Sequence, residues 1–224
     1  MKAIIASTST IHGSGYLEYL KTVLNTHFKG IEQILFVPYA RPSGLSHDEY
    51  SSKAKEGLAF LNAEVKGLHE FENTVDALQS AKAIFVGGGN TFLLVKTLHE
   101  KHLMEVLKNK ILNNTPYLGT SAGSNICGPN MQTTNDMPIV MPKSFETLGV
   151  IPFNINAHYI EPDQNSKHKG ETRRTRIKEF QAHNDINVLG LKEGSWLEAK
   201  DDKDEIKTYE AINFHVTQLY FKCL

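Results

Sequence analysis

The 224-residue sequence has no excess of charge of either sign, because 24 Lys and Arg residues are matched by 25 Asp and Glu residues. A protein that binds nucleic acid usually carries a basic excess or a basic run, so nucleic-acid partners are not expected. The two cysteines, Cys127 and Cys223, are too few for a disulfide framework and form no metal-type cluster. These absences predict an ordinary globular protein in a reducing, cytoplasmic setting.

Long apolar runs are also missing. No segment approaches the roughly 20 uninterrupted apolar residues that cross a bilayer, and the opening MKAIIASTST turns polar too early for a signal peptide. We therefore expect no membrane contact. The length allows a sizeable core, and no repeat, low-complexity stretch or linker interrupts the chain, so residues 1–224 are predicted to form a single domain.

Short apolar runs alternate with helical patterns through the first half of the chain. Strands are predicted at KAIIA (2–6), ILFVPY (34–39), VKGLHEF (65–71), AIFV (83–86) and YLG (117–119). Continuous apolar strands that alternate with helices are typical of a parallel sheet covered on both faces. The fold class predicted is therefore α/β, with a doubly wound, mostly parallel sheet.

The pattern changes from about Ile139 onward. FNINAHYIE and INVLGL are strand-like, and GETRRTRIKEF between them is helix-like. WLEA and EIKTYE flank the turn-like KDDKD, which predicts an antiparallel hairpin near the C-terminus.

A serine between two glycines follows the strand YLG directly. Gly119-Thr120-Ser121-Ala122-Gly123 fits the G-x-S-x-G nucleophile elbow, in which small neighbours allow a sharp strand-to-helix turn that exposes the serine. Ligands of open parallel sheets bind at this end of the strands. The alternative is that the glycines merely ease a strand-helix crossing.

Acyl transfer at Ser121 would also need backbone N–H donors for an oxyanion. Gly88 and Gly89 follow the strand AIFV at the same end of the sheet, and the amide of Ala122 could supply a further donor. A phosphate-binding loop is the alternative for GGGNTF. It is disfavoured because Phe92 stands where G-x-G-x-x-G needs its last glycine and no G-K-[ST] follows.

Serine needs a neighbouring base, and His158 at the end of FNINAH is the candidate among ten histidines. A buried, hydrogen-bonded core histidine is the alternative. Metal sites are less favoured, since no H-E-x-x-H motif is present. The residues considered for them are His99 and His102, which share a helix face, and Glu161, Asp163 and His168, which follow His158.

A carboxylate should orient the imidazole and stabilise its protonated form. Asp136, in TTNDMPI, and Glu193, in LKEGSW, both lie in predicted loops. Each could instead be an ordinary turn or solvated surface residue. The sequence leaves open which of the two contacts His158.

Six fragments in order, FVGGGNTF, GTSAGSN, TTNDMPI, NAHYIEPD, GETRRTRI and LKEGSW, resemble the peptidase E family of aspartyl dipeptidases up to about Trp196. The resemblance implies a fold related to the class I glutamine amidotransferases. It also implies hydrolysis of dipeptides with an N-terminal aspartate, without metal or organic cofactor.

Carried over by position, the resemblance makes Ser121 the nucleophile and His158 the general base. Either Asp136 or Glu193 would be the third member. The residues implied to line the oxyanion hole are Gly88, Gly89 and Ala122.

Binding of the substrate's aspartate side chain requires a fixed cation, and arginine can bind a carboxylate through two parallel hydrogen bonds. Arg173 and Arg176 would share one face of the predicted helix, and Arg173 is the first candidate. Both could instead be surface charges.

The expected partners are small peptide substrates, and the expected state is a monomer or homodimer. Two other functions stay open, a cyanophycinase-like hydrolase of aspartate-linked arginine polymers and a non-catalytic small-molecule binding protein of the same fold.

Overall fold

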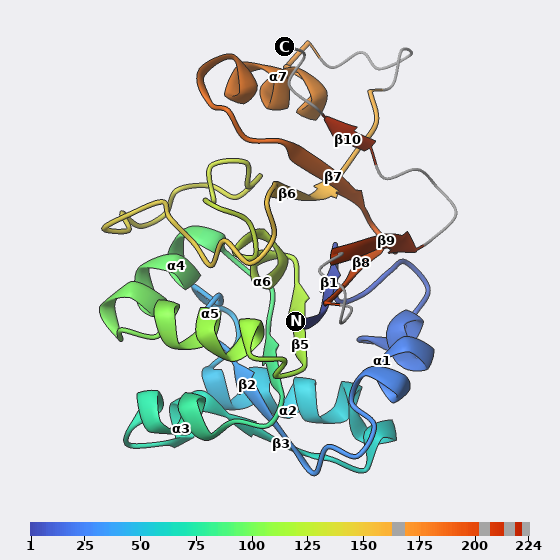
Figure 1. Cartoon of the computed structure of the whole chain (residues 1–224), viewed down its shortest axis with the longest axis vertical. Helices are drawn as coiled ribbons and strands as arrows, with labels where there is room; N and C mark the ends of the chain where they lie inside the picture. The colour runs from blue at the N-terminus through green and yellow to red at the C-terminus, as the bar shows by residue number, and fades with distance from the viewer. Residues whose placement is uncertain (163–168, 202–206, 213–217, 221–224) are drawn as a thin grey trace.

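The computed structural model describes residues 1–162, 169–201, 207–212 and 218–220 (Figure 1). Two sheets are present in this part of the chain, one of seven strands and one of three. Within the same ranges, none of the helices combines the length and the apolar character that spanning a bilayer requires.

The main sheet has the strand order β3-β2-β4-β5-β1-β8-β9. Its first five strands run parallel, and β8 and β9 are antiparallel additions at one edge. The bounds are β1 Lys2–Ala6, β2 Gln33–Val37, β3 Glu64–Gly67, β4 Ile84–Val86, β5 Tyr117–Thr120, β8 Trp196–Asp201 and β9 Lys207–Ile212. The predicted mostly parallel α/β sheet is confirmed, as is the C-terminal hairpin, whose predicted residues 205 and 206 lie outside the described ranges.

Helices cover both faces of the main sheet because successive strand residues point to opposite sides. In β2, Ile34 and Phe36 pack with α1 and α2, whereas Leu35 and Val37 pack with α3, α4 and α5 (Figure 1). The bounds are α1 Lys21–His27, α2 His47–Gly57, α3 Thr74–Ser80, α4 Thr91–Glu100 and α5 Met104–Leu112, with single 3-10 turns at η1 Glu18–Leu20, η2 Ala59–Leu61 and η3 Leu68–Glu70.

Polar side chains fix where several helices begin. Ser46 and Glu49 form a reciprocal capping box at α2, Asn73 caps α3, and Asn90 caps α4. Thr172 caps α7, Arg173–His183, so this helix begins and ends three residues later than the predicted segment. The residues after the triple glycine therefore enter α4 in a fixed direction.

The second sheet has the order β10-β7-β6 and was not foreseen as a separate layer. It comprises β6 Asn154–Tyr159, β7 Val188–Lys192 and β10 Gln218–Tyr220, with β6 and β7 parallel. Helix α7 packs on it through Ile177, which joins Tyr159 and Val188 in a small apolar cluster. In Figure 1 this sheet lies beyond the end of β5, where the main sheet's loops gather.

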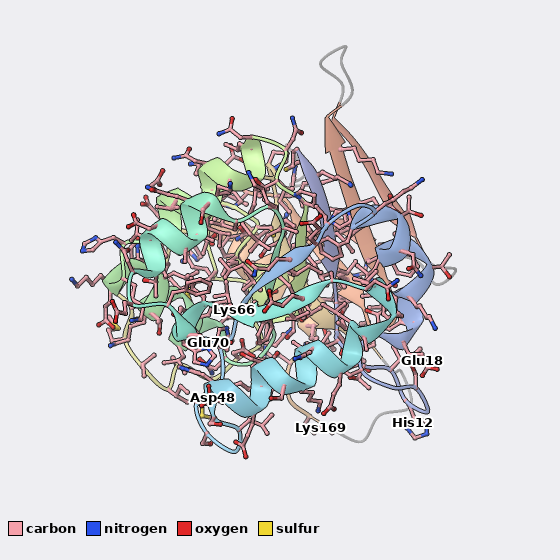
Figure 2. All side chains as sticks on the ribbon, turned by 90° about the horizontal axis from the view of Figure 1, so that it is seen from below. His12, Glu18, Asp48, Lys66, Glu70 and Lys169 are labelled. Carbon is pink, nitrogen blue, oxygen red and sulfur yellow. The ribbon has the colours of Figure 1, made fainter. Side chains whose placement is uncertain are left out.

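Figure 2 shows charged side chains near β3, which is an edge strand of the main sheet. Asp48 of α2 lies near Lys66 of β3 and Glu70, and the three residues help to line a polar cavity of about 280 Å³. None of the predicted site residues lines this cavity.

Candidate active site

Ser121 occupies a strained turn between β5 and α6 (Ala122–Asn125), with φ 52° and ψ −109°. Such a conformation costs on the order of 1–3 kcal/mol in a non-glycine residue and needs support from its surroundings. Glycine is required two positions before the serine, because a Cβ on Gly119 would lie 2.5 Å from the carbonyl oxygen of Gly123. Glycine is also required two positions after the serine, because a Cβ on Gly123 would lie 2.2 Å from the carbonyl oxygen of Val86. The turn has the geometry of a nucleophile elbow, although the helix after it is a single turn.

The carbonyl group of Ala6, at the end of β1, holds this turn. It accepts a 3.1 Å hydrogen bond from the backbone N–H of Ser121 and a 2.6 Å bond from the hydroxyl of Ser124. The Ser124 hydroxyl also lies 2.9 Å from the carbonyl oxygen of Gly119. The serine is thereby fixed to the centre of the main sheet.

His158 lies within hydrogen-bonding distance of Ser121 and Glu193. Its Nε2 is 2.9 Å from the Ser121 Oγ, and its Nδ1 is 3.0 Å from the Glu193 Oε1. The ladder between β6 and β7 is irregular at this residue, and His158 adopts a φ of +56°. This irregularity turns the imidazole toward the main sheet. A hydroxyl, an imidazole and a carboxylate in this order form a nucleophile, a base and an orienting acid.

Asp136 lies in a different network. Its Oδ2 accepts hydrogen bonds from the backbone N–H of Thr91 at 2.7 Å, from the Thr91 hydroxyl at 2.5 Å and from the Thr134 hydroxyl at 3.0 Å. No hydrogen bond joins it to His158 within the described residues. Asp136 therefore stabilises the first turn of α4, and the geometry assigns the orienting position to Glu193.

The glycine-rich loop lies against the serine. A Cβ on Gly88 would be 3.0 Å from the Ser121 Cβ, and Gly89 has a φ of +143°, which L residues rarely adopt. The hydroxyl of Tyr50 donates to the Gly88 carbonyl at 3.0 Å. Among the described residues, the backbone N–H groups of Gly88, Gly89 and Ala122 donate to no backbone carbonyl. These donors are available to an oxyanion.

The two candidate arginines differ in their surroundings. Arg173, the first residue of α7, is half-buried, and its buried Nη1 has no hydrogen-bond partner among the described residues. Burial, with a contribution from Arg176, lowers its guanidinium pKa, while Glu193 and Asp136 oppose that shift. Arg176 is exposed and helps to line a polar cavity of about 200 Å³ beside Asp136. Arg173 is thus the better placed cation for a carboxylate.

Other reactive side chains do not compete with Ser121. Cys127 is buried under the elbow, and burial raises its thiol pKa to about 12. Where the chain is described, no three His, Cys, Asp or Glu side chains are grouped as metal ligands. His99 bonds the carbonyl oxygen of Glu146 instead, and Asp163 and His168 lie outside the described ranges.

A larger cavity, of about 460 Å³, is lined in part by Lys2, Tyr19 and Trp196, and none of the predicted site residues lines it. The candidate site is instead the hydrogen-bonded group of side chains around Ser121.

Sequence reasoning missed several supporting residues of the site. Ser7 and Tyr50 bond the backbones of His158 and Gly88, and the buried Asn125 accepts from the backbone N–H of Ala157. Ser7 directly follows a predicted strand, at the carboxyl end where parallel sheets bind ligands, so its position could have indicated a role in the site. No comparable signal marks Tyr50 or Asn125.

The sequence is similar to known proteins along most of its length. The sequence matches peptidase family S51 over residues 3–207. It is 45% identical to peptidase E of Streptomyces coelicolor, covering 91% of this chain and 82% of that protein. It is 43% identical to a Drosophila melanogaster protein named as a probable alpha-aspartyl dipeptidase, covering 89% and 83%. A peptidase E-like structure from Listeria monocytogenes superposes with a TM-score of 0.68 at 18% identity, covering 95% of this chain and 98% of that one, and supports the fold.

Proposed function

Because this chain belongs to peptidase family S51, we propose that it is a serine-type dipeptidase that cleaves dipeptides with an N-terminal aspartate. The hydrogen-bonded series from Ser121 through His158 to Glu193 carries the proposal. The names of the relatives, peptidase E and alpha-aspartyl dipeptidase, support the substrate class. We also propose that the enzyme is cytoplasmic, that it is a monomer or homodimer, and that it needs no cofactor.

The reaction begins when His158 takes the proton from the Ser121 hydroxyl as its oxygen attacks the peptide carbonyl carbon. Glu193 keeps the imidazole in the tautomer whose Nε2 accepts that proton and stabilises the imidazolium that forms. The backbone N–H groups of Gly88, Gly89 and Ala122 face the developing oxyanion. Each such donor typically contributes about 3–4 kcal/mol to lowering the barrier.

Collapse of the tetrahedral intermediate breaks the C–N bond and leaves an ester on Ser121. His158 donates its proton to the departing amine of the second amino acid. A water molecule then attacks the ester, again with His158 as the base, and releases free aspartate.

Arg173 would bind the side-chain carboxylate of the substrate aspartate. An unpartnered, half-buried guanidinium N–H group favours such a ligand, because an anion would supply the missing acceptor. Charge-assisted hydrogen bonds contribute about 1.5–3 kcal/mol, which corresponds to roughly 10- to 150-fold in kcat/KM.

The decisive experiment compares Asp-Leu, Asn-Leu, Glu-Leu and Ala-Leu as substrates of the wild-type enzyme and of three variants. Ser121→Ala should fold and lose roughly a millionfold in kcat, as removal of a triad serine does. Arg173→Met should lose activity mainly on Asp-Leu. Arg174→Met, an exposed position on the same helix, is the matched control and should retain it.

Undiminished Asp-Leu cleavage by Ser121→Ala would refute the nucleophile. Equal cleavage of all four dipeptides by the wild-type enzyme would refute the aspartate specificity. The cyanophycinase-like alternative predicts faster cleavage of the aspartate-arginine polymer than of Asp-Leu, and a non-catalytic binding protein would cleave neither.

A further inference from the structure

Two consecutive residues at the end of β1 hold the two halves of the site. The carbonyl oxygen of Ala6 accepts from the backbone N–H of Ser121, and the hydroxyl oxygen of Ser7 accepts from the backbone N–H of His158 at 2.9 Å. Ser121 follows a strand of the main sheet, whereas His158 belongs to β6 of the second sheet. The Ala6 carbonyl group and the Ser7 side chain therefore connect the backbone of the nucleophile to that of its base.

The Ser7 hydroxyl also reaches the strand that leads to Glu193. It donates a 2.7 Å hydrogen bond to the carbonyl oxygen of Leu191, two residues before Glu193 on β7. Ser7 is 0% exposed, and its own N–H donates to the carbonyl oxygen of Ser195 at 3.0 Å. The hydroxyl thus lies between both strands that carry the His158–Glu193 pair, and it is itself fixed to the main sheet.

The irregularity in β6 explains why a hydroxyl is needed there. The β6–β7 pairing is regular up to Ala157 and Leu191 and shifts before Tyr159, so His158 lies in the break. A bulge leaves backbone groups that the ladder cannot pair, and buried groups of this kind need another partner. A serine hydroxyl can accept from an N–H and donate to a C=O at the same time.

We propose that Ser7 is a positioning residue that sets the separation between the Ser121 hydroxyl and the His158–Glu193 pair. This inference rests on the proposed function, because it concerns the same nucleophile and base. Loss of the hydroxyl leaves the His158 N–H and the Leu191 C=O without this shared partner and frees the second sheet to shift relative to Ser121. A shift of about 1 Å between reacting groups can lower a rate roughly a hundredfold.

Three variants of Ser7 and one control test the inference. Ser7→Ala removes the hydroxyl, Ser7→Cys keeps a side chain with weaker hydrogen bonds, and Ser7→Thr keeps the hydroxyl. Thr147→Val is the matched control, because Thr147 is buried and its hydroxyl donates to the Gly128 carbonyl, away from the site. Denaturant unfolding, kcat and KM for Asp-Leu and the rate of Ser121 labelling by a fluorophosphonate are measured for each.

Ser7→Ala should lower kcat and the labelling rate together by roughly 10- to 100-fold, with little change in KM. Ser7→Cys should fall between Ser7→Ala and the wild-type enzyme, and Ser7→Thr should recover most of the rate. Thr147→Val should lose stability but keep the wild-type kcat and labelling rate. If Ser7→Ala does not fold, the comparison of Ser7→Cys and Ser7→Thr with the wild type decides the matter.

Wild-type kcat and labelling in folded Ser7→Ala, or in Ser7→Cys if the alanine variant does not fold, would overturn the inference. A rate loss in Thr147→Val equal to that in Ser7→Ala would also overturn it, since any buried hydroxyl would then suffice. Failure of the proposed function has a different signature. In that case the wild-type enzyme would be labelled at Ser121 without cleaving Asp-Leu, and the labelling rates would still test Ser7.

Discussion

Replacing Glu193 by glutamine tests which carboxylate serves His158. The Glu193 Oε1 lies 3.0 Å from the His158 Nδ1, whereas Asp136 binds Thr91 and Thr134. The substitution keeps the shape of the side chain and removes its charge. The imidazolium that forms during attack by Ser121 would then lose its counter-ion, so kcat should fall while binding of the substrate changes little.

The expected magnitude follows from the exposure of the pair. Two unit charges about 4 Å apart near a protein surface attract by roughly 4 kcal/mol at an effective dielectric constant of about 20. The Glu193 side chain is 60% exposed, so solvent screens part of this attraction. A net loss of about 1.5–3 kcal/mol, or roughly 10- to 150-fold in kcat, is expected. A fully buried triad aspartate would cost roughly 10⁴-fold.

Steady-state kinetics on Asp-Leu and denaturant unfolding of Glu193→Gln and Asp136→Asn provide the assay. Glu193→Gln should lose kcat at nearly unchanged stability. Asp136→Asn should keep most of its kcat and lose about 0.3–1 kcal/mol of unfolding free energy, because a charge at the N-terminus of α4 is removed. A larger fall in kcat for Asp136→Asn than for Glu193→Gln would refute the assignment.

Two further changes give measurable outcomes. Gly88→Ala places a Cβ 3.0 Å from the Ser121 Cβ and should lower kcat by displacing the loop, to be measured on Asp-Leu; an unchanged kcat would contradict the role of that loop. Burial, followed by the charge of Lys2, lowers the pKa of His27 to about 3 from 6.5, and its Nε2 lies 3.0 Å from the Tyr117 carbonyl oxygen. Between these two pH values the unfolded chain binds the proton and the folded one does not, so acidification favours unfolding. Lowering the pH from 7 to 5 should therefore lower the free energy of unfolding by about 2 kcal/mol through His27. Denaturant titrations at the two pH values should show that His27→Gln loses about 2 kcal/mol less unfolding free energy than the wild type. An identical pH dependence of stability in the two proteins would contradict this role of His27.

The sequence predicted the main sheet well because its strands are short apolar runs buried on both sides. KAIIA, AIFV and YLG became β1, β4 and β5, and the elbow followed the last of them. Local chemistry was enough at the elbow. Glycine is required at positions 119 and 123, because a Cβ at either position would lie 2.5 Å or less from a backbone carbonyl oxygen.

The sequence could not decide between Asp136 and Glu193 because the answer depends on long-range packing. His158 lies in β6 of a second sheet, and nothing in the sequence of β6 marks it as part of a separate layer. Its turn toward Ser121 comes from a break in the β6–β7 pairing. No local pattern marks that break. The hydroxyl of Ser7, 151 positions away along the chain, satisfies the backbone of His158 there.

The central claim is that Ser121 and His158 act as nucleophile and base, and the most direct measurement is fluorophosphonate labelling followed by peptide mass spectrometry. The wild-type enzyme should carry the label on Ser121. In folded His158→Gln the labelling rate should fall by roughly 10²- to 10⁴-fold, since the general base is lost. A label on another residue, or an equal rate in the two proteins, would contradict the account.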